Sequence, residues 1–78
     1  NYTVQVGSFD DYESIPVFIK RLQLNRASLF LTKSKGYFRL FYGEYTNKKM
    51  AKIVSEQFNN DGLDSFVLSV DFSQLNRY

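Results

Sequence analysis

The stretch that decides the fold is Lys35-Gly-Tyr-Phe-Arg-Leu-Phe-Tyr-Gly-Glu-Tyr45, which holds five aromatic rings and one arginine in eleven residues. If Gly36 closes a turn, a strand begins at Tyr37 and its side chains alternate between two faces. One face is apolar and carries Phe38, Leu40 and Tyr42. The other carries two rings around a guanidinium, from Tyr37, Arg39 and Phe41. This second face is either buried by another layer or open to a ligand that accepts flat apolar surface and a positive charge.

Composition limits the chemistry that the chain can perform. Its 78 residues make one domain, and a hydrophobic content of 44% with fourteen Phe and Tyr residues supplies the core. Cysteine and histidine are absent, which removes disulfides, thiolate metal sites, the commonest metal ligand and the commonest general base. We therefore expect no cofactor and no metal site.

The charged residues point to no particular partner. A net charge of +2 lies far below the strongly basic balance of a dedicated duplex nucleic-acid binder. The eight carboxylates are scattered over predicted caps, turns and helix surfaces, so no pair converges for general acid and base work. We expect a domain without catalytic residues.

The sequence shows neither a membrane-spanning nor a signal-peptide pattern. No apolar run approaches the roughly eighteen residues of a membrane span, so we expect no membrane contact by this domain itself. The chain opens at Asn1 without a signal-like segment, which is typical of an excised domain. We expect any targeting or anchoring segment to lie in a parent chain.

The first half of the chain predicts a strand followed by a helix. Tyr2–Gly7 alternates apolar and polar residues and ends at a glycine. The helix should run to about Leu24, with Asp10 as its N-cap and Glu13 three residues further on. Pro16 falls in the second turn of this helix, where it should kink the helix or delay its regular part.

The second half predicts a second helix and two more strands, one before and one after the strand within Lys35–Tyr45. The apolar run Ser28–Lys33 is a strand, and a hairpin turn joins it to the strand that begins at Tyr37. Thr46 or Asn47 can cap the second helix, and Gly62 suits its left-handed C-terminal position. The apolar stripe of that helix consists of Met50, Ala51, Val54 and Phe58. Ser65–Val70 is the last strand.

The order of elements repeats once. A shift of thirty-six residues aligns Val4–Phe9 with Leu40–Tyr45, and each segment is followed by a helix. Neither half can cover its own apolar face, so we predict one α+β domain with a ferredoxin-like (RNP-like) βαββαβ fold over residues 1–72, and a tail or linker over 73–78. Right-handed crossovers arrange four antiparallel strands in the order 4-1-3-2, with two helices on one face. The other face is left open.

Each half also carries a glycine motif before its helix, Val4-Gln-Val-Gly-Ser-Phe9 in the first and Tyr37-Phe-Arg-Leu-Phe-Tyr-Gly43 in the second. In these motifs and their spacing, residues 2–70 resemble the SPOR (sporulation-related repeat) domain. Members of that family are βαββαβ modules appended to bacterial cell-division proteins, lytic enzymes and peptidoglycan amidases. The resemblance implies a carbohydrate-binding module that recognises septal peptidoglycan, prefers glycan strands stripped of their stem peptides, and targets its parent protein to the division septum.

The resemblance also implies a location and a set of binding residues. The domain would act as a monomer on the periplasmic or cell-wall side of the bacterial inner membrane, with glycan strands rather than nucleic acid as its partner. The family's Gln-x-Gly-Ser motif matches at Gln5 and Ser8. Its aromatic residue matches at Tyr37, its arginine at Arg39 and its apolar last-strand position at Val67. All five are expected on the open face or its rim.

The side chains themselves suit a sugar. A sugar ring can lie with its C–H bonds against Tyr37 or Phe41, while the Gln5 amide offers donors and an acceptor to an N-acetyl group. Stripping the stem peptide from a muramyl residue frees a lactyl carboxylate, which Arg39 could bind with two charge-assisted hydrogen bonds. Phe41 is bulkier than the family's usual aliphatic residue and Glu44 replaces its usual proline, so ligand preference could differ.

Two other functions stay open at this point. The segment Lys35–Tyr42 partly matches the RNP1 signature of single-stranded RNA-binding modules. However, Phe38 stands where that signature needs a small residue and Arg39 where it needs a stacking ring. The remaining alternative is a protein–protein interaction domain, in which Tyr37 and Phe41 pack against a partner.

Overall fold

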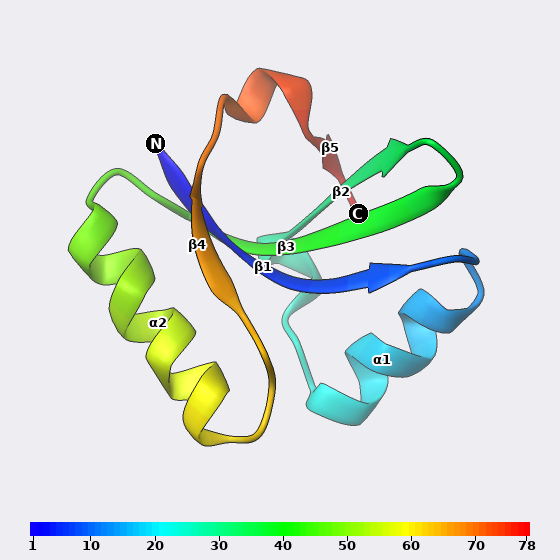
Figure 1. Cartoon of the computed structure of the whole chain (residues 1–78), viewed down its shortest axis with the longest axis horizontal. Helices are drawn as coiled ribbons and strands as arrows, with labels where there is room; N and C mark the ends of the chain where they lie inside the picture. The colour runs from blue at the N-terminus through cyan, green and yellow to red at the C-terminus, as the bar shows by residue number, and fades with distance from the viewer.

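The computed structural model describes residues 1–78 as a sheet of five antiparallel strands with two helices (Figure 1). In chain order the elements are β1 (Tyr2–Phe9), α1 (Ser14–Leu22), η1 (Arg26–Ser28), β2 (Leu29–Ser34), β3 (Tyr37–Tyr45), α2 (Lys48–Asn60), β4 (Phe66–Ser69), η2 (Phe72–Gln74) and β5 (Asn76–Arg77). The strand order β4-β1-β3-β2-β5 contains the predicted order 4-1-3-2, so the ferredoxin-like α+β prediction is confirmed. The structure adds β5 beside β2.

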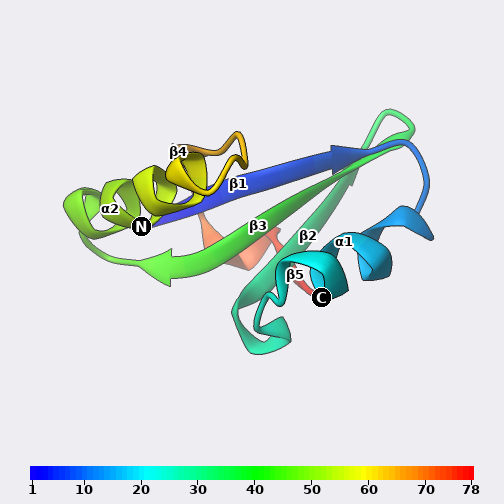
Figure 2. The same ribbon diagram turned by 90° about the horizontal axis from the view of Figure 1, so that it is seen from below.

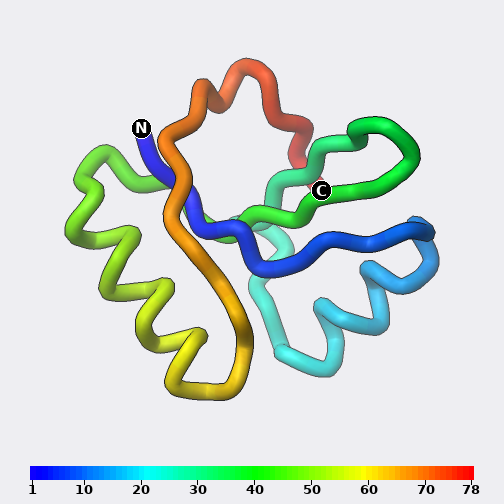
Figure 3. The backbone as a smooth tube through the Cα atoms, viewed as in Figure 1, coloured from blue at the N-terminus to red at the C-terminus, as the bar shows by residue number.

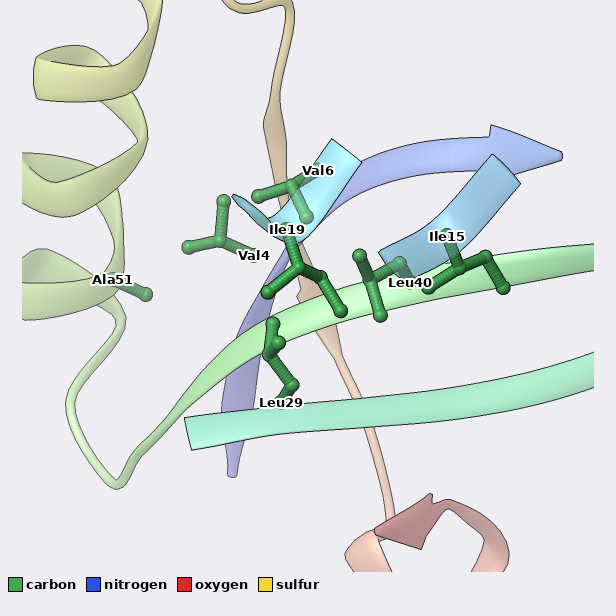
Figure 4. Packing of buried hydrophobic residues seen from close by; sticks show 7 residues of the cluster. All are labelled: Val4, Val6, Ile15, Ile19, Leu29, Leu40 and Ala51. Carbon is green, nitrogen blue, oxygen red and sulfur yellow. The ribbon is translucent and has the colours of Figure 1, made fainter. Parts of the chain in front are cut away.

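The hydrophobic core lies between the sheet and the helices. Its seven buried residues come from β1, β2, β3 and both helices: Val4, Val6, Ile15, Ile19, Leu29, Leu40 and Ala51 (Figure 4). Because one cluster joins residues of α1 and α2, both helices cover the same face of the sheet, as predicted. In Figure 2 the helices lie in front of the strands, whereas η2 and β5 lie behind them.

A two-residue turn joins β2 to β3 and sets their register. Lys35 and Gly36 have positive φ angles of 47° and 87°, which is typical of a type I′ turn. Ser34 and Tyr37 therefore face each other at the start of the ladder. The predicted hairpin is confirmed.

The first helix begins later than predicted. We expected Asp10 to cap it, but α1 starts at Ser14, whose N–H and hydroxyl both donate to Oδ1 of Asp11, at 2.9 and 2.8 Å. Glu13 makes no side-chain cap. The later start places Pro16 in the first helical turn, where an N–H has no partner within the helix, so proline is compatible with it.

The second helix has the predicted ends. The side chain of Asn47 accepts a hydrogen bond from the N–H of Lys49 at 2.8 Å. Gly62 follows the helix with a φ of 89°. Ala51 is fully buried, but Met50 of the predicted apolar stripe is 52% exposed and lies outside the core.

Both copies of the repeated glycine motif place a ring over their glycine. A Cβ atom at Gly7 would lie 2.8 Å from the ring of Phe9, and one at Gly43 would overlap the ring of Tyr45. Gly43 also has a φ of 84°, which residues with a side chain rarely adopt. Burial raises the pKa of Tyr45, and the neighbouring Tyr42 adds to this rise. The repeat is therefore a packing motif in which a ring covers bare backbone.

Residues 71–78 return to the sheet, although residues 73–78 were expected to form a tail or linker. After β4 the chain crosses to the far edge of the sheet and pairs with β2, where Arg77 faces Phe30 (Figure 3). The N–H of Tyr78 donates to the carbonyl of Leu29 at 3.1 Å. Because Leu29 points into the core, alternation directs Phe30 to the face opposite the helices.

This returning segment covers part of that opposite face. The ring of Phe72 lies 5.1 Å from the ring of Phe30, and the Cζ of Arg77 lies 5.3 Å from the same ring. Asp71 begins the segment and accepts hydrogen bonds from the hydroxyl and the N–H of Ser73, at 2.8 and 3.0 Å. These hydrogen bonds hold the pKa of Asp71 below its ordinary value. The cap on η2 is therefore intact at neutral pH.

We expect Phe72→Ala to lower the free energy of unfolding by about 1.5 kcal/mol, because a half-buried ring supplies about half of what full burial supplies. Urea denaturation followed by circular dichroism measures the change. Gln74→Ala is the matched control, since Gln74 is exposed in the same segment and its loss should stay within about 0.5 kcal/mol. Equal losses for the two variants would contradict a docked C-terminal segment.

Candidate functional site

A β-bulge in β1 decides which side chains reach the open face, the face opposite the helices. The register pairs Gln5 with Phe41 and Ser8 with Arg39, with a shift between Gln5 and Gly7. Three steps along β1 therefore match two steps along β3, and the alternation restarts after the bulge. Gln5 and Ser8 consequently share the open face, although unbroken alternation would place them on opposite faces.

Arg39 lies at the middle of the open face. Its guanidinium donates a hydrogen bond to the hydroxyl of Tyr37 at 2.7 Å, and its Cζ lies 5.3 Å from the centre of that ring. The two side chains are neighbours because residues i and i+2 of a strand point the same way. Ser8 and Thr32 flank Arg39 on the adjacent strands, so its cross-strand neighbours are uncharged. The hydroxyl of Tyr37 engages one of the five guanidinium N–H groups, and the others remain for a ligand.

Phe41 does not present its ring on the surface, contrary to the prediction. It is 3% exposed and faces Phe30, which is 6% exposed. The returning segment covers Phe30 with Phe72 and Arg77, and Phe41 is buried beside it. Phe41 therefore supports the sheet from within, and Tyr37 is the ring that β3 offers to a ligand.

Val67 lies on the helix side of the sheet, so its expected place on the open face is wrong. It faces Val4 in the ladder and packs against the core. The outward residue beside it is Phe66, which faces Gln5 and is 51% exposed. Sequence reasoning missed Phe66 because β4 begins with three consecutive apolar residues, which show no alternation. Its pairing with Gln5 is the signal that identifies its face.

These placements leave an uncovered strip across the open face, which we call the open band. Six residues of four strands form it: Gln5, Ser8, Thr32, Tyr37, Arg39 and Phe66. All six are exposed or half-buried, and Arg39 is the charged member. The band combines two rings, an amide, hydroxyl groups and one cation. This set suits an elongated ligand with both apolar and polar surface and room for a negative charge.

The hollows of the surface lie outside the centre of the open band, and one of them, against α2, is lined by Phe66 at the edge of the band. The largest, about 480 Å³, lies against α1, and none of the four is lined by Gln5, Ser8 or Arg39. The open band is thus a flat surface rather than a pocket. No group of three or more acidic, histidine or cysteine side chains could hold a metal ion. None of the helices has the length and apolar character needed to cross a membrane.

Comparison with known proteins connects this architecture to one family. The sequence model of the SPOR domain matches residues 1–69. Among solved structures, the fold is similar to the solution structure of the peptidoglycan binding domain of the B. subtilis cell wall lytic enzyme CwlC, with a TM-score of 0.68. The alignment covers 90% of this chain and 89% of that chain at 19% sequence identity. A separate comparison with curated proteins found no match.

Proposed function

Because this chain belongs to the SPOR domain family, we propose that it is a non-catalytic module whose open band binds the glycan strands of peptidoglycan. The CwlC domain supports this choice of ligand, since it is described as peptidoglycan binding. The residues proposed to contact the glycan are Gln5, Ser8, Tyr37 and Arg39. Phe41 and Val67 act on this surface indirectly, through the packing of the sheet beneath it.

The observation that carries the proposal is the pair formed by Arg39 and Tyr37 on a flat face. A sugar ring can stack its C–H bonds on Tyr37, while the amide of Gln5 and the hydroxyl of Ser8 bind the polar groups at the rim of the sugar. Because Tyr37 fixes the guanidinium of Arg39, little side-chain entropy is lost when a carboxylate binds to it.

A preference for stripped glycan follows from the chemistry of that carboxylate. A muramyl residue without its stem peptide carries a free lactyl carboxylate, whereas an intact stem peptide converts this group into an amide. Arg39 can form two parallel charge-assisted hydrogen bonds with the two oxygens of the carboxylate, whereas the amide offers one carbonyl oxygen and no negative charge. We therefore propose that the domain selects stripped strands and so brings its parent protein to the division septum, on the periplasmic or cell-wall side of the membrane.

The test is co-sedimentation of the domain with purified sacculi before and after amidase treatment. We expect more of the domain to be retained after treatment, and Gln5→Ala to reduce retention about fivefold, because one polar contact contributes about 1 kcal/mol. Gln57→Ala is the matched control, since Gln57 is exposed on α2 and lies outside the open band. This control should be retained like the wild type.

A titration with single-stranded RNA beside the sacculi separates the competing functions. Absence of retention on both forms of the sacculus would contradict the glycan proposal. Tight and salt-sensitive RNA binding in that case would reassign the open band to a nucleic acid. Absence of binding in both the sacculus assay and the RNA titration would favour a protein partner.

A further inference from the structure

β4 is an edge strand, and some of its backbone groups have no strand to pair with. In the sheet it has one neighbour, β1. The N–H of Val70 donates to the carbonyl of Asn1 at 2.9 Å, so the backbone of Val70 points towards β1. Alternate residues of an antiparallel strand point the same way, so Leu68 also points towards β1, whereas Val67 and Ser69 direct their N–H and C=O groups away from it.

The outward backbone groups of β4 open onto a groove whose other wall is α2. The groove measures about 300 Å³, and the strand and the helix run antiparallel beside it (Figure 1). The backbone of Ser65 points the same way as those of Val67 and Ser69. Its N–H donates to Oδ1 of Asn59 on α2 at 2.9 Å. This hydrogen bond closes one end of the groove, and the backbone is free from Val67 onwards.

The α2 wall of the groove is polar and bears a positive charge. It consists of five side chains at helical spacing, none of which is apolar: Lys48, Lys52, Ser55, Glu56 and Asn59. Two lysines against one glutamate leave a net positive charge on this wall. An apolar side chain that enters the groove would find no apolar surface on the helix, whereas an acidic side chain would meet two ammonium groups.

The lysines lie beside the unpaired part of β4. Asn59 contacts Ser65, and the helix and the strand run past each other from this point. Lys52 lies about 10 Å along α2 from Asn59, which corresponds to about three residues of extended strand from Ser65. That level is Leu68, between the two residues whose backbone points outwards. A peptide paired with β4 would therefore pass within reach of Lys52.

We propose that β4 binds an extended acidic segment of a partner protein, which adds to the sheet as a further strand in the groove beside α2. The backbone of the segment pairs with Val67 and Ser69, and its acidic side chains contact Lys48 and Lys52. This site is independent of the glycan, because no residue proposed to contact the glycan takes part in it. A second copy of this chain suits the groove less well, since it would bring another α2 with the same net positive wall.

The probe is the fluorescent six-residue peptide Thr-Glu-Val-Glu-Val-Thr. Its binding to the domain is followed by anisotropy and, at saturation, by hydrogen exchange of the backbone amides. We expect saturable binding that slows the exchange of the Val67 and Ser69 amides about tenfold, while the amide of Leu68, already bonded to β1, changes little. The basic peptide Thr-Lys-Val-Lys-Val-Thr should bind about tenfold more weakly.

Ser69→Pro tests the backbone pairing. It removes one outward N–H and places a ring on the edge, which an edge strand tolerates because this N–H has no partner in the sheet. Binding of the acidic peptide should fall about tenfold. Ser69→Ala is the matched control, since it keeps the N–H, and it should bind like the wild type. Both variants should be retained on amidase-treated sacculi like the wild type, and their unfolding midpoints report whether they are folded.

Variants of α2 test the charge and do not depend on the folding of Ser69→Pro. Lys52→Glu should weaken binding of the acidic peptide about tenfold, and Glu56→Gln should strengthen it about twofold, because they change the charge of the wall in opposite directions. Lys20→Glu makes the same charge change as Lys52→Glu on α1, outside the groove, and should bind like the wild type. Added salt should reduce the effect of Lys52→Glu.

The outcomes separate this inference from the proposed function. Peptide binding without slower exchange at Val67 and Ser69 would overturn the pairing with β4, and so would an absence of binding. Equal binding of the acidic and basic peptides would overturn the choice of an acidic partner. A dimer in sedimentation without peptide, abolished by Ser69→Pro, would assign the edge to a second copy instead. Loss of retention on sacculi with peptide binding intact would overturn the glycan proposal alone.

Discussion

Arg39→Ala should weaken binding to peptide-stripped glycan by about ten- to a hundredfold, the largest loss expected from one substitution in the open band. Hydrogen bonds to a charged group contribute about 1.5 to 3 kcal/mol, which corresponds to this range. Arg39 is the band's charged residue, and Tyr37 holds it in place at 2.7 Å. Binding is measured by calorimetry with stripped glycan and, in parallel, with glycan that keeps its stem peptides.

Arg21→Ala is the matched control for charge. Arg21 is exposed in the last turn of α1, outside the open band, and its loss lowers the net charge of the domain by the same amount. We expect Arg21→Ala to bind like the wild type. Equal weakening by both substitutions would reduce the role of Arg39 to general electrostatic attraction. If Arg39→Ala weakened binding to stripped glycan and to peptide-bearing glycan equally, Arg39 would still contact the glycan. The proposal that it selects the free lactyl carboxylate would then be wrong.

Gly43→Ala should lower the free energy of unfolding by about 2 to 4 kcal/mol, a large share of the stability of a small domain. Two costs combine at this position. Gly43 has a φ of 84°, which costs a residue with a side chain about 1 to 2 kcal/mol. In addition, the new methyl group would overlap the ring of Tyr45, which must leave its packed position. Urea denaturation of the variant and the wild type measures the difference.

Gly36→Ala separates the two costs. Gly36 has a similar φ of 87°, but nothing lies within 4 Å of a Cβ atom built on it. We expect Gly36→Ala to lose the backbone cost alone, about 1 to 2 kcal/mol. If both variants lost the same free energy of unfolding, the ring of Tyr45 would move aside at no cost. The packing of the ring on Gly43 would then not require a glycine at that position. A double variant with Tyr45→Ala should remove the extra cost at Gly43.

Much of the fold was predictable because its signals are local. The turn at Lys35 and Gly36, the cap at Asn47 and the glycine at Gly62 act on a few neighbouring residues, and the structure confirms all of them. The start of α1 was wrong by three residues, because Asp10 and Asp11 are both plausible caps and the position of Pro16 favours the second. The returning C-terminal segment was not predictable, since its two-residue strand has no periodicity and forms through contacts with β2.

In the candidate site, too, local patterns were predictable and contacts between distant segments were not. Tyr37 and Arg39 follow from alternation within one strand, and the structure brings them together. Phe41 obeys the same alternation, yet it is buried beside Phe30, which is covered by a segment that a local pattern does not reveal. Val67 was expected on the open face from the family resemblance. The unbroken apolar run of β4 could not test this expectation, and the register with β1 places Phe66 there instead.

The pairing of β5 with β2 has a consequence for solubility. Without β5, β2 would be an edge strand, and its backbone would expose unpaired amide groups beside the apolar run Leu29–Leu31. Such an edge is a template for adding a strand from another molecule, which leads to aggregation. β5 occupies the ladder positions of Phe30 and Leu31, and the opposite edge, β4, is only four residues long. β5 thus covers an edge of the sheet on which another molecule could otherwise add a strand.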